Sequence, residues 1–336
     1  MERRVSTPDI AVIGAGMTGL VCASRLADAG FSVRVYDKGR GVGGRIATRR
    51  AGTGLRFDHG APFVDAESPE MAALLDRIAT EGSAVIASHA VDQEARLQGT
   101  QARRTFGLPG MSGLLRPLAE RVTLHRESEV SGVVRDDRGW RLSFEDGRAP
   151  EGCDILICAV PAPQARVLLA DVTDVAERLA AVEFDPCWTV MVGFAAAQAV
   201  DLRALRGSGE LFAHVYREND KPGREDLLMA CWVLHAAADW SIRHLELDRP
   251  EAADRLLQAL RSASNGSLPD PQFLAAHRWR YARTRRALGS PYASNAESTL
   301  FVGGDWCLGD SVDHAFRSGT AMAEAIVDRD AAHGLR

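Results

Sequence analysis

The first part of the chain alternates short apolar runs with one helix-like stretch. Residues 10–13 and 31–36 form the apolar runs, and residues 20–29 form the stretch between them. This order predicts a β-strand, an α-helix and a second β-strand. Together these elements make a βαβ unit with two parallel strands.

Later segments extend the pattern in two ways. Short strands are predicted at residues 122–124, 130–134 and 140–144, and the apolar run 155–160, stopped by a proline, predicts a buried parallel strand. The pattern then changes to four segments typical of an antiparallel sheet and one helix. The segments are residues 188–194, 211–216, 227–235 and 275–281, and the helix is at residues 250–260. A helix is also predicted from Met111 to Leu118.

The junction between the first strand and the first helix carries the sequence Gly14-Ala15-Gly16-Met17-Thr18-Gly19. In such a turn the first glycine allows the tight bend, the second lets the backbone approach a pyrophosphate, and the third lets helix and strand pack closely. The helix N-terminus offers free N–H groups to the phosphates. Asp37, at the end of the second strand, is placed to accept hydrogen bonds from a ribose. The sequence therefore predicts a dinucleotide site.

Two further segments favour FAD over NAD as the dinucleotide. A glycine-rich run directly after Asp37 includes Lys38, Arg40, Gly44 and Arg45, and its arginines can bind a second face of the pyrophosphate. Near the other end, an apolar strand at residues 299–302 leads into Gly304 and Asp305, and a helix begins near Val312. Asp305 can bind a polyol hydroxyl, and that helix can direct its N-terminus at an isoalloxazine ring.

These patterns predict an α/β protein with a discontinuous Rossmann-type FAD-binding domain and an inserted α+β substrate domain built on an antiparallel sheet. The FAD-binding domain is expected at residues 1–75, 109–165 and 297–330. The substrate domain is expected at residues 76–108 and 166–296.

Six motifs together resemble the renalase-like branch of the flavin amine oxidase superfamily. They are GAGMTG from Gly14, DKGRGVGGR from Asp37, FDHGA from Phe57, PGMSGL from Pro109, HRWRYA from His277 and GGD from Gly303. The resemblance extends from about Ile10 to Ile326, and the segments around Met111 and Trp279 are those that point to renalases.

The resemblance implies several residue roles and an activity. Thr18, Arg45 and Ala61 match flavin contacts of the family, and Val130 matches a residue whose backbone pairs with the adenine. Family members oxidise dihydronicotinamide dinucleotides reduced at the wrong ring position, and they pass the electrons to oxygen to give peroxide. The substrate is therefore expected to be a nicotinamide dinucleotide, with molecular oxygen as the acceptor.

Composition agrees with a soluble enzyme. The 336-residue chain is 46% hydrophobic and carries a net charge of −5, so we expect a substantial core and no nucleic-acid partner. No apolar stretch is long enough for a membrane span. The six cysteines form no C-x-x-C pair, which favours free thiols in a reducing, cytoplasmic setting. No cluster has metal-ligand spacing, and no metal is predicted.

Candidates for the chemistry are His59, His235 and Trp279. Period-2 alternation places Trp279 on one strand face with His277 and Tyr281, where the rings stack a nicotinamide, line a flavin cavity or simply pack on helices. His235 ends an apolar strand, where it either contacts substrate or caps the sheet. His59 lies in the FDHGA segment, where a structural role in the turn competes with acid–base work.

The lysines bear on the reaction. Related amine oxidases hold a lysine near flavin N5 through a water, whereas this chain has only Lys38 and Lys221, and Lys221 is expected in an exposed polar loop. Oxidation of a dihydropyridine needs no general base, because the ring nitrogen's lone pair drives hydride transfer. We therefore expect a renalase-type oxidase. One alternative is an amine oxidase or desaturase acting on another small substrate, and a second is a flavin-binding protein with a sensing role. FAD is expected to be bound non-covalently, since Cys307 follows the glycine–aspartate motif whereas covalently flavinylated relatives attach through a cysteine before it.

Overall fold

The computed structural model describes residues 7–52, 54–87, 103–196, 198, 200–202, 205, 211–264 and 268–332. The chain forms two compact units, each described separately below. Unit 1 comprises Met1–Gly44, Leu115–Glu183 and Thr284–Arg336, and unit 2 comprises Arg45–Leu114 and Phe184–Arg283.

Unit 1 is built on a six-stranded sheet with the order β17-β18-β12-β1-β2-β8. The bounds are β1 Asp9–Ile13, β2 Ser32–Tyr36, β8 Thr123–His125, β12 Ile155–Cys158, β17 Ala293–Ser294 and β18 Leu300–Val302. All neighbouring pairs are parallel except β17 with β18. Ile10 pairs with Val33 on one side and with Ile155 on the other, so the apolar run of β1 is buried between two strands. The predicted Rossmann-type architecture is confirmed.

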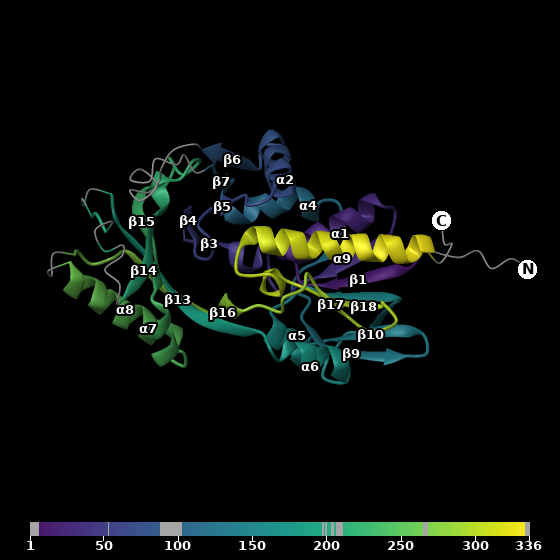
Figure 1. Ribbon diagram of the computed structural model, residues 1–336. Helices are drawn as coiled ribbons and strands as arrows, with labels where there is room; N and C mark the ends of the chain where they lie inside the picture. Colours follow the sequence, from purple (N-terminus) through teal and green to yellow (C-terminus); the bar gives the residue numbers. More distant parts are fainter. Residues whose placement is uncertain are drawn as a thin grey trace, which may run out of the picture. The chain divides into compact units, whose positions relative to one another are not determined.

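Two long helices of unit 1 lie side by side along this sheet (Figure 1). They are α1, Met17–Asp28, and α9, Val312–Ala332. Gly319 makes the close approach possible, because a Cβ at that position would lie 2.4 Å from the Thr18 carbonyl oxygen. The Thr18 hydroxyl also donates to the Ala315 carbonyl at 3.0 Å. A contact between segments almost 300 residues apart therefore joins the two ends of the chain.

The rest of unit 1 consists of a small sheet and short helices. The sheet has the order β11-β10-β9, formed by Glu151–Cys153, Gly139–Phe144 and Val130–Asp136. The helices are α4 Arg116–Ala119, α5 Ala162–Leu168, α6 Thr173–Leu179 and the 3-10 turn η5 Asp305–Cys307.

The helix predicted from Met111 to Leu118 is instead a 3-10 turn, η2 Met111–Leu115, followed by α4. An added Cβ at Gly113 would lie 2.0 Å from the Leu108 carbonyl oxygen, so the chain is packed tightly against itself there.

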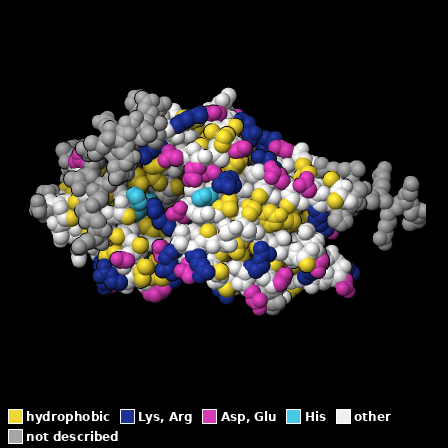
Figure 2. Space-filling view, in the orientation of Figure 1, with side chains coloured by type: hydrophobic (Ala, Val, Ile, Leu, Met, Phe, Trp, Pro, Cys, Tyr) yellow, Lys and Arg dark blue, Asp and Glu magenta, His cyan; other side chains and the backbone are white. Residues whose placement is uncertain are grey.

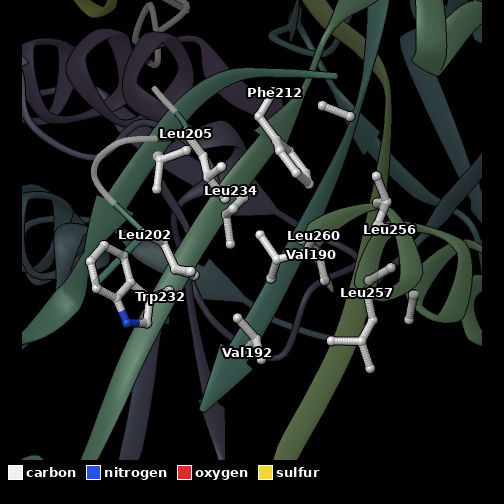
Figure 3. Close-up of a cluster of buried hydrophobic side chains, with 14 of the residues drawn as sticks. Val190, Val192, Leu202, Leu205, Phe212, Trp232, Leu234, Leu256, Leu257 and Leu260 are labelled. Atoms are coloured by element: carbon white, nitrogen blue, oxygen red, sulfur yellow. The ribbon is translucent and has the colours of Figure 1, made fainter. Parts of the chain in front are cut away.

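Unit 2 contains the antiparallel sheet that the sequence predicts. Its order is β14-β15-β13-β16, formed by Phe212–Arg217, Met229–Ala236, Glu183–Ala195 and Phe273–Arg286. Helices α7 Ala238–Arg243 and α8 Arg249–Ala263 accompany it, and the Asp248 side chain caps α8 by accepting from the Glu251 N–H at 2.7 Å. Val190, Trp232 and Leu234 on one sheet face pack with Leu256 and Leu260 of α8 in a buried core (Figure 3).

The opposite face of that sheet packs on a hairpin from earlier in the chain. The hairpin is β3 Thr48–Ala51 with β4 Leu55–Asp58, and its Phe57 is buried with Met191, Cys231 and Val233. A further sheet, β5-β7-β6, comprises Val64–Asp65, Arg104–Gly107 and Ala84–Ala87, beside α2 Pro69–Thr80; η1 Gly44–Ile46 and η4 Glu218–Asp220 are 3-10 turns.

This packing moves the domain boundaries away from the predicted ones. Residues 45–75 and 109–114 belong to unit 2, although the sequence placed them in the FAD-binding domain. Residues 166–183 and 284–296 belong to unit 1, although the sequence placed them in the substrate domain. The physical reason is the apolar contact of the β3–β4 hairpin with β15, which ties the segment after the glycine-rich run to the antiparallel sheet.

The visible surface mixes both signs of charge. Figure 2 shows basic and acidic side chains interspersed with apolar ones, without a field of a single sign. Within the described residues, no helix is long and apolar enough to cross a membrane.

Candidate functional site

The glycine loop of unit 1 has the geometry that a pyrophosphate requires. Gly14 has φ +107°, and a Cβ there would lie 2.6 Å from the Ala159 carbonyl oxygen, so this position needs glycine for the turn. An added Cβ at Gly19 would lie 2.0 Å from the Gly14 carbonyl oxygen. At Gly16, by contrast, a Cβ would meet no atom of the described residues within 4 Å. The protein thus leaves space beside Gly16, at the N-cap of α1, where a phosphate fits.

Asp37 joins this loop to the glycine-rich run that follows. One carboxylate oxygen accepts from the Ala15 N–H and the other from the Gly39 N–H, each at 2.7 Å. Each oxygen keeps a second lone pair, so the carboxylate can also accept from a ribose hydroxyl. Gly43 N–H donates to the Ala15 carbonyl at 3.2 Å, which brings the run back onto the first loop.

Two basic side chains of that run lie on the surface, whereas its glycine Gly44 lies close to Gly16. Lys38 and Arg40 are exposed, and Lys38 forms a surface ion pair with Glu129 at 3.5 Å. Gly44 adopts φ +54°, and an added Cβ would lie 3.6 Å from the Gly16 Cα. The backbone of the run at Gly44 therefore borders the Gly16 space.

Hydrogen bonds and burial hold the C-terminal motif of unit 1 in place. Gly304 donates its N–H to the Ser318 hydroxyl at 3.1 Å, and Asp305 is buried, with its carbonyl accepting from Gly309 N–H at 2.8 Å. Val312 begins α9 as predicted. Val130 is buried at the start of β9. These residues all belong to unit 1, as do the glycine loop and Asp37.

Arg45 and Ala61 belong to unit 2, where they lie together. Ala61 N–H donates to the Arg45 carbonyl at 2.9 Å, and an added Cβ at Gly60 would lie 1.9 Å from the same oxygen. The glycine of the FDHGA segment is therefore needed for this contact. Arg45 also reaches the Ala282 carbonyl of β16 at 3.5 Å.

Two of the predicted catalytic residues meet in one aromatic group, the tryptophan cluster of His59, His277 and Trp279. His59 stacks on Trp279 with ring centroids 5.1 Å apart, and His277 lies 4.2 Å from Trp279. Trp279 Nε1 donates to the His59 carbonyl at 2.9 Å, which fixes the turn. Burial lowers the pKa of His59 to about 4 and that of His277 to about 3, so both imidazoles are neutral near pH 7.

The third predicted residue, His235, belongs to a second group, the histidine–tyrosine cluster of His214, Tyr216 and His235. Its ring lies 6.1 Å from that of His214 and 5.8 Å from that of Tyr216. Burial, followed by the charges of His214 and Arg283, lowers the pKa of His235 to about 3. Its Nε2 atom is buried and finds no hydrogen-bond partner in the part of the chain that the structure describes.

The alternation along β16 is borne out on both faces. His277 and Trp279 contact each other on one face, and Arg278 and Arg280 on the other both bind Glu246. Tyr281 packs against Phe184, with ring centroids 5.6 Å apart.

The prediction that Lys221 lies in an exposed loop is wrong. Lys221 forms a buried charge cluster with Asp58, Glu218 and Arg224, whose side chains are all at most 4% exposed. Its Nζ lies 2.7 Å from Glu218 and 3.0 Å from Asp58, and Arg224 lies 2.6 Å from Asp58. Two cations therefore face two carboxylates, and this pairing explains how a polar segment is buried.

The cluster also fixes the residue before His59. Asp58 accepts from the Thr48 hydroxyl at 2.7 Å and the Met111 N–H at 3.0 Å. Burial raises the pKa of Asp58, but Lys221 and Arg224 outweigh it and hold that pKa below its usual value. Burial raises the pKa of Glu218.

Sequence reasoning missed this cluster and the residues His214, Tyr216 and Arg283. One signal was present: Lys221 and Arg224 are three residues apart in a chain with only two lysines, and FDHGA contains an unexplained acid.

The cysteines and the possible metal ligands add no further candidate site among the described residues. All six cysteines are free, and burial raises the pKa of the Cys307 thiol to about 12. Among the described residues, no group of three or more His, Cys, Asp and Glu could hold a metal ion.

The sheet order, the glycine loop and Asp37 define unit 1 as a dinucleotide-binding Rossmann fold. Residues 12–78 match the profile of the NAD(P)-binding Rossmann-like domain, and residues 78–327 match that of the flavin containing amine oxidoreductase. The chain therefore belongs to the flavin containing amine oxidoreductase family. This membership confirms FAD as the cofactor and the predicted class, an FAD-dependent oxidoreductase.

Individual proteins agree at the level of fold. The chain resembles a structure provisionally described as a protoporphyrinogen oxidase from Exiguobacterium sp. 255-15, with TM-score 0.74, 14% identity and coverage of 96% and 99% of the two chains. Cyclohexylamine oxidase from Brevibacterium oxydans IH-35A gives TM-score 0.66 at 13% identity, with the same coverage. A 4,4'-diapophytoene desaturase of Staphylococcus aureus is 46% identical over 55 residues, which is 16% of this chain and 11% of the desaturase.

Proposed function

We propose that this protein is a renalase-type oxidase of 1,2- or 1,6-dihydro-NAD(P). In the overall reaction, dihydropyridine, O₂ and a proton give the pyridinium and H₂O₂. FAD, when bound, supplies a two-electron acceptor that oxygen can reoxidise. Gly16, the first turn of α1 and Asp37 are the residues we expect to hold it in unit 1.

The tryptophan cluster is the observation that carries the proposal. It offers Trp279 together with two imidazoles that are neutral near pH 7, His59 and His277. Such a surface suits stacking and orienting a pyridine ring. Dihydropyridine oxidation needs orientation but no general base, because the ring nitrogen's lone pair drives departure of hydride. Histidines with pKa values of about 3 and 4 are poor general bases near pH 7, and this chemistry does not need them.

The lysines also support an oxidase that uses no lysine. The reason is their ion pairs and not the exposed position that the sequence predicts for Lys221. Lys221 binds two carboxylates, and Lys38 pairs with Glu129 on the surface. Both ammonium groups are therefore engaged in ion pairs, which disfavours a role for either lysine in positioning a water beside the flavin. An amine oxidase or desaturase acting on another small substrate is the alternative that the family name and the desaturase match favour.

Anaerobic mixing tests these assignments directly. We expect 1,2- or 1,6-dihydro-NAD(P) to bleach the flavin rapidly, and oxygen to restore its colour with release of peroxide and NAD(P)⁺. The 1,4 isomer should react roughly 100-fold more slowly, since misplacement of the reacting carbon by about 1 Å can have that effect. Faster bleaching by a primary or secondary amine would move the protein to the amine oxidase alternative. If none of these dihydronicotinamides or amines bleaches the flavin, the result would favour the alternative of a flavin-binding protein with a sensing role.

A further inference from the structure

Strand β16 carries five arginines, and four of them have carboxylate partners. Arg278 and Arg280 bind Glu246, and Arg285 and Arg286 bind Glu183. Arg283 is different, because no carboxylate of the described residues lies within 4.0 Å of it. Its charge is thus left uncompensated by the part of the protein that the structure describes.

Arg283 instead lies against a histidine of the same sheet. Its Nη2 atom is 3.1 Å from Nε2 of His214. A guanidinium can only donate, so His214 Nε2 accepts this bond. As an acceptor, His214 orients the guanidinium and supplies no negative charge to it. Within the described residues Arg283 makes no other hydrogen bond, so its remaining N–H groups can donate to the oxygens of a phosphate.

The surroundings of this pair point to a ligand. His235 pairs with His214 across the β14–β15 ladder, and its buried Nε2 atom has no hydrogen-bond partner among the described residues. Tyr216 stacks on His214 with ring centroids 6.0 Å apart. A guanidinium, two imidazoles and a phenol thus gather on one sheet, and no carboxylate of the described residues binds the guanidinium. Such a group attracts anions and disfavours cationic amines.

We propose that Arg283, oriented by His214 and flanked by His235, forms a subsite for a phosphate of the substrate. This inference rests on the proposed function, which supplies the pyrophosphate of a nicotinamide dinucleotide. The subsite would distinguish the dinucleotide from the corresponding nucleoside, which has the same ring and no phosphate.

Binding to the FAD-loaded full-length protein tests the subsite without turnover. NAD⁺, inorganic pyrophosphate and nicotinamide riboside are titrated by calorimetry into the wild type and Arg283→Met. We expect the variant to bind NAD⁺ and pyrophosphate roughly 10- to 100-fold more weakly and the riboside equally well. Arg280→Met is the matched control, because Arg280 lies on the same strand but binds Glu246. Arg283→Lys should recover part of the affinity.

The outcomes separate the subsite from the proposed function. Unchanged phosphate binding in Arg283→Met, an equal loss for the riboside, or no measurable phosphate binding by the wild type would overturn the subsite. If no dihydronicotinamide bleaches the flavin but Arg283→Met still binds pyrophosphate more weakly than the wild type, the subsite stands and the oxidase proposal fails. FAD content and melting temperature of each variant exclude misfolding as the cause.

Discussion

At the scale of single residues, the buried charge cluster is the least expected feature of unit 2. Moving ions out of water is costly, and only close pairing and further hydrogen bonds offset that cost. Here each carboxylate has cationic neighbours, and Asp58 has two additional donors, Thr48 and Met111. The balance depends on every member of the cluster being present. Removing one cation leaves carboxylates buried without their counter-charge.

Lys221→Met is therefore expected to lower the free energy of unfolding by about 3–5 kcal/mol, as breaking a buried ion pair does. Urea unfolding monitored by circular dichroism measures this change. Lys38→Met is the control, since its exposed pair with Glu129 should contribute less than about 1 kcal/mol. A loss for Lys221→Met no larger than that for Lys38→Met would show that the cluster does not stabilise the fold.

Lys221 also shows why some residues cannot be placed from sequence. The segment around it is polar and rich in turn formers, which normally indicates exposure. Its partner Asp58 lies 163 residues earlier in the chain. No local pattern reports a pairing over that separation, whereas local patterns did report the alternation that brings His277 and Trp279 together on β16.

At the scale of elements, the β1–loop–α1 unit could be predicted almost completely, because every constraint on it is local. The apolar runs became β1 and β2, and the three glycines have the three separate reasons that the motif implies. The helix expected from Met111 failed for a tertiary reason. The close approach of Gly113 to Leu108 shapes that segment more than its helical spacing of apolar residues does.

The glycines of the loop allow a matched pair of substitutions. In Gly16→Val the side chain enters the open space expected to hold the pyrophosphate, so we expect a folded but colourless protein. In Gly19→Val the side chain meets the Gly14 carbonyl, so we expect the fold itself to be destabilised, even without cofactor. The flavin-to-protein absorbance ratio and the melting temperature of apoprotein separate the two effects. A Gly16→Val variant that retains full flavin would contradict the placement of the pyrophosphate.

At the scale of the whole molecule, the chain crosses between the two units several times. The sequence predicted a discontinuous domain, because the strands and motifs typical of a flavin domain occur at both ends of the chain. It misplaced the boundaries, because the packing of Phe57 against Met191 and Val233 depends on segments far apart in sequence. Boundaries of this kind follow from which faces bury each other, and one sequence does not report that.

The neutral histidines give the whole molecule a predictable response to acid. His59, His277 and His235 have pKa values of about 4, 3 and 3 in the folded protein, below the usual value of about 6.5 that holds in the unfolded chain. Between those values the unfolded chain binds more protons, so the free energy of unfolding falls as the pH falls from about 6.5 towards 4. Above about pH 7 these groups have no effect, because they are neutral in both states.

Melting temperatures between pH 5 and pH 8 test this expectation. We expect a plateau above about pH 7 and a decline below it, in which each histidine contributes at most about 1.4 kcal/mol per pH unit. His277→Phe keeps an aromatic ring beside Trp279 and removes one titrating group, so its decline should be shallower than that of the wild type. A variant whose melting temperature follows the wild-type slope would mean that His277 takes up its proton equally in both states.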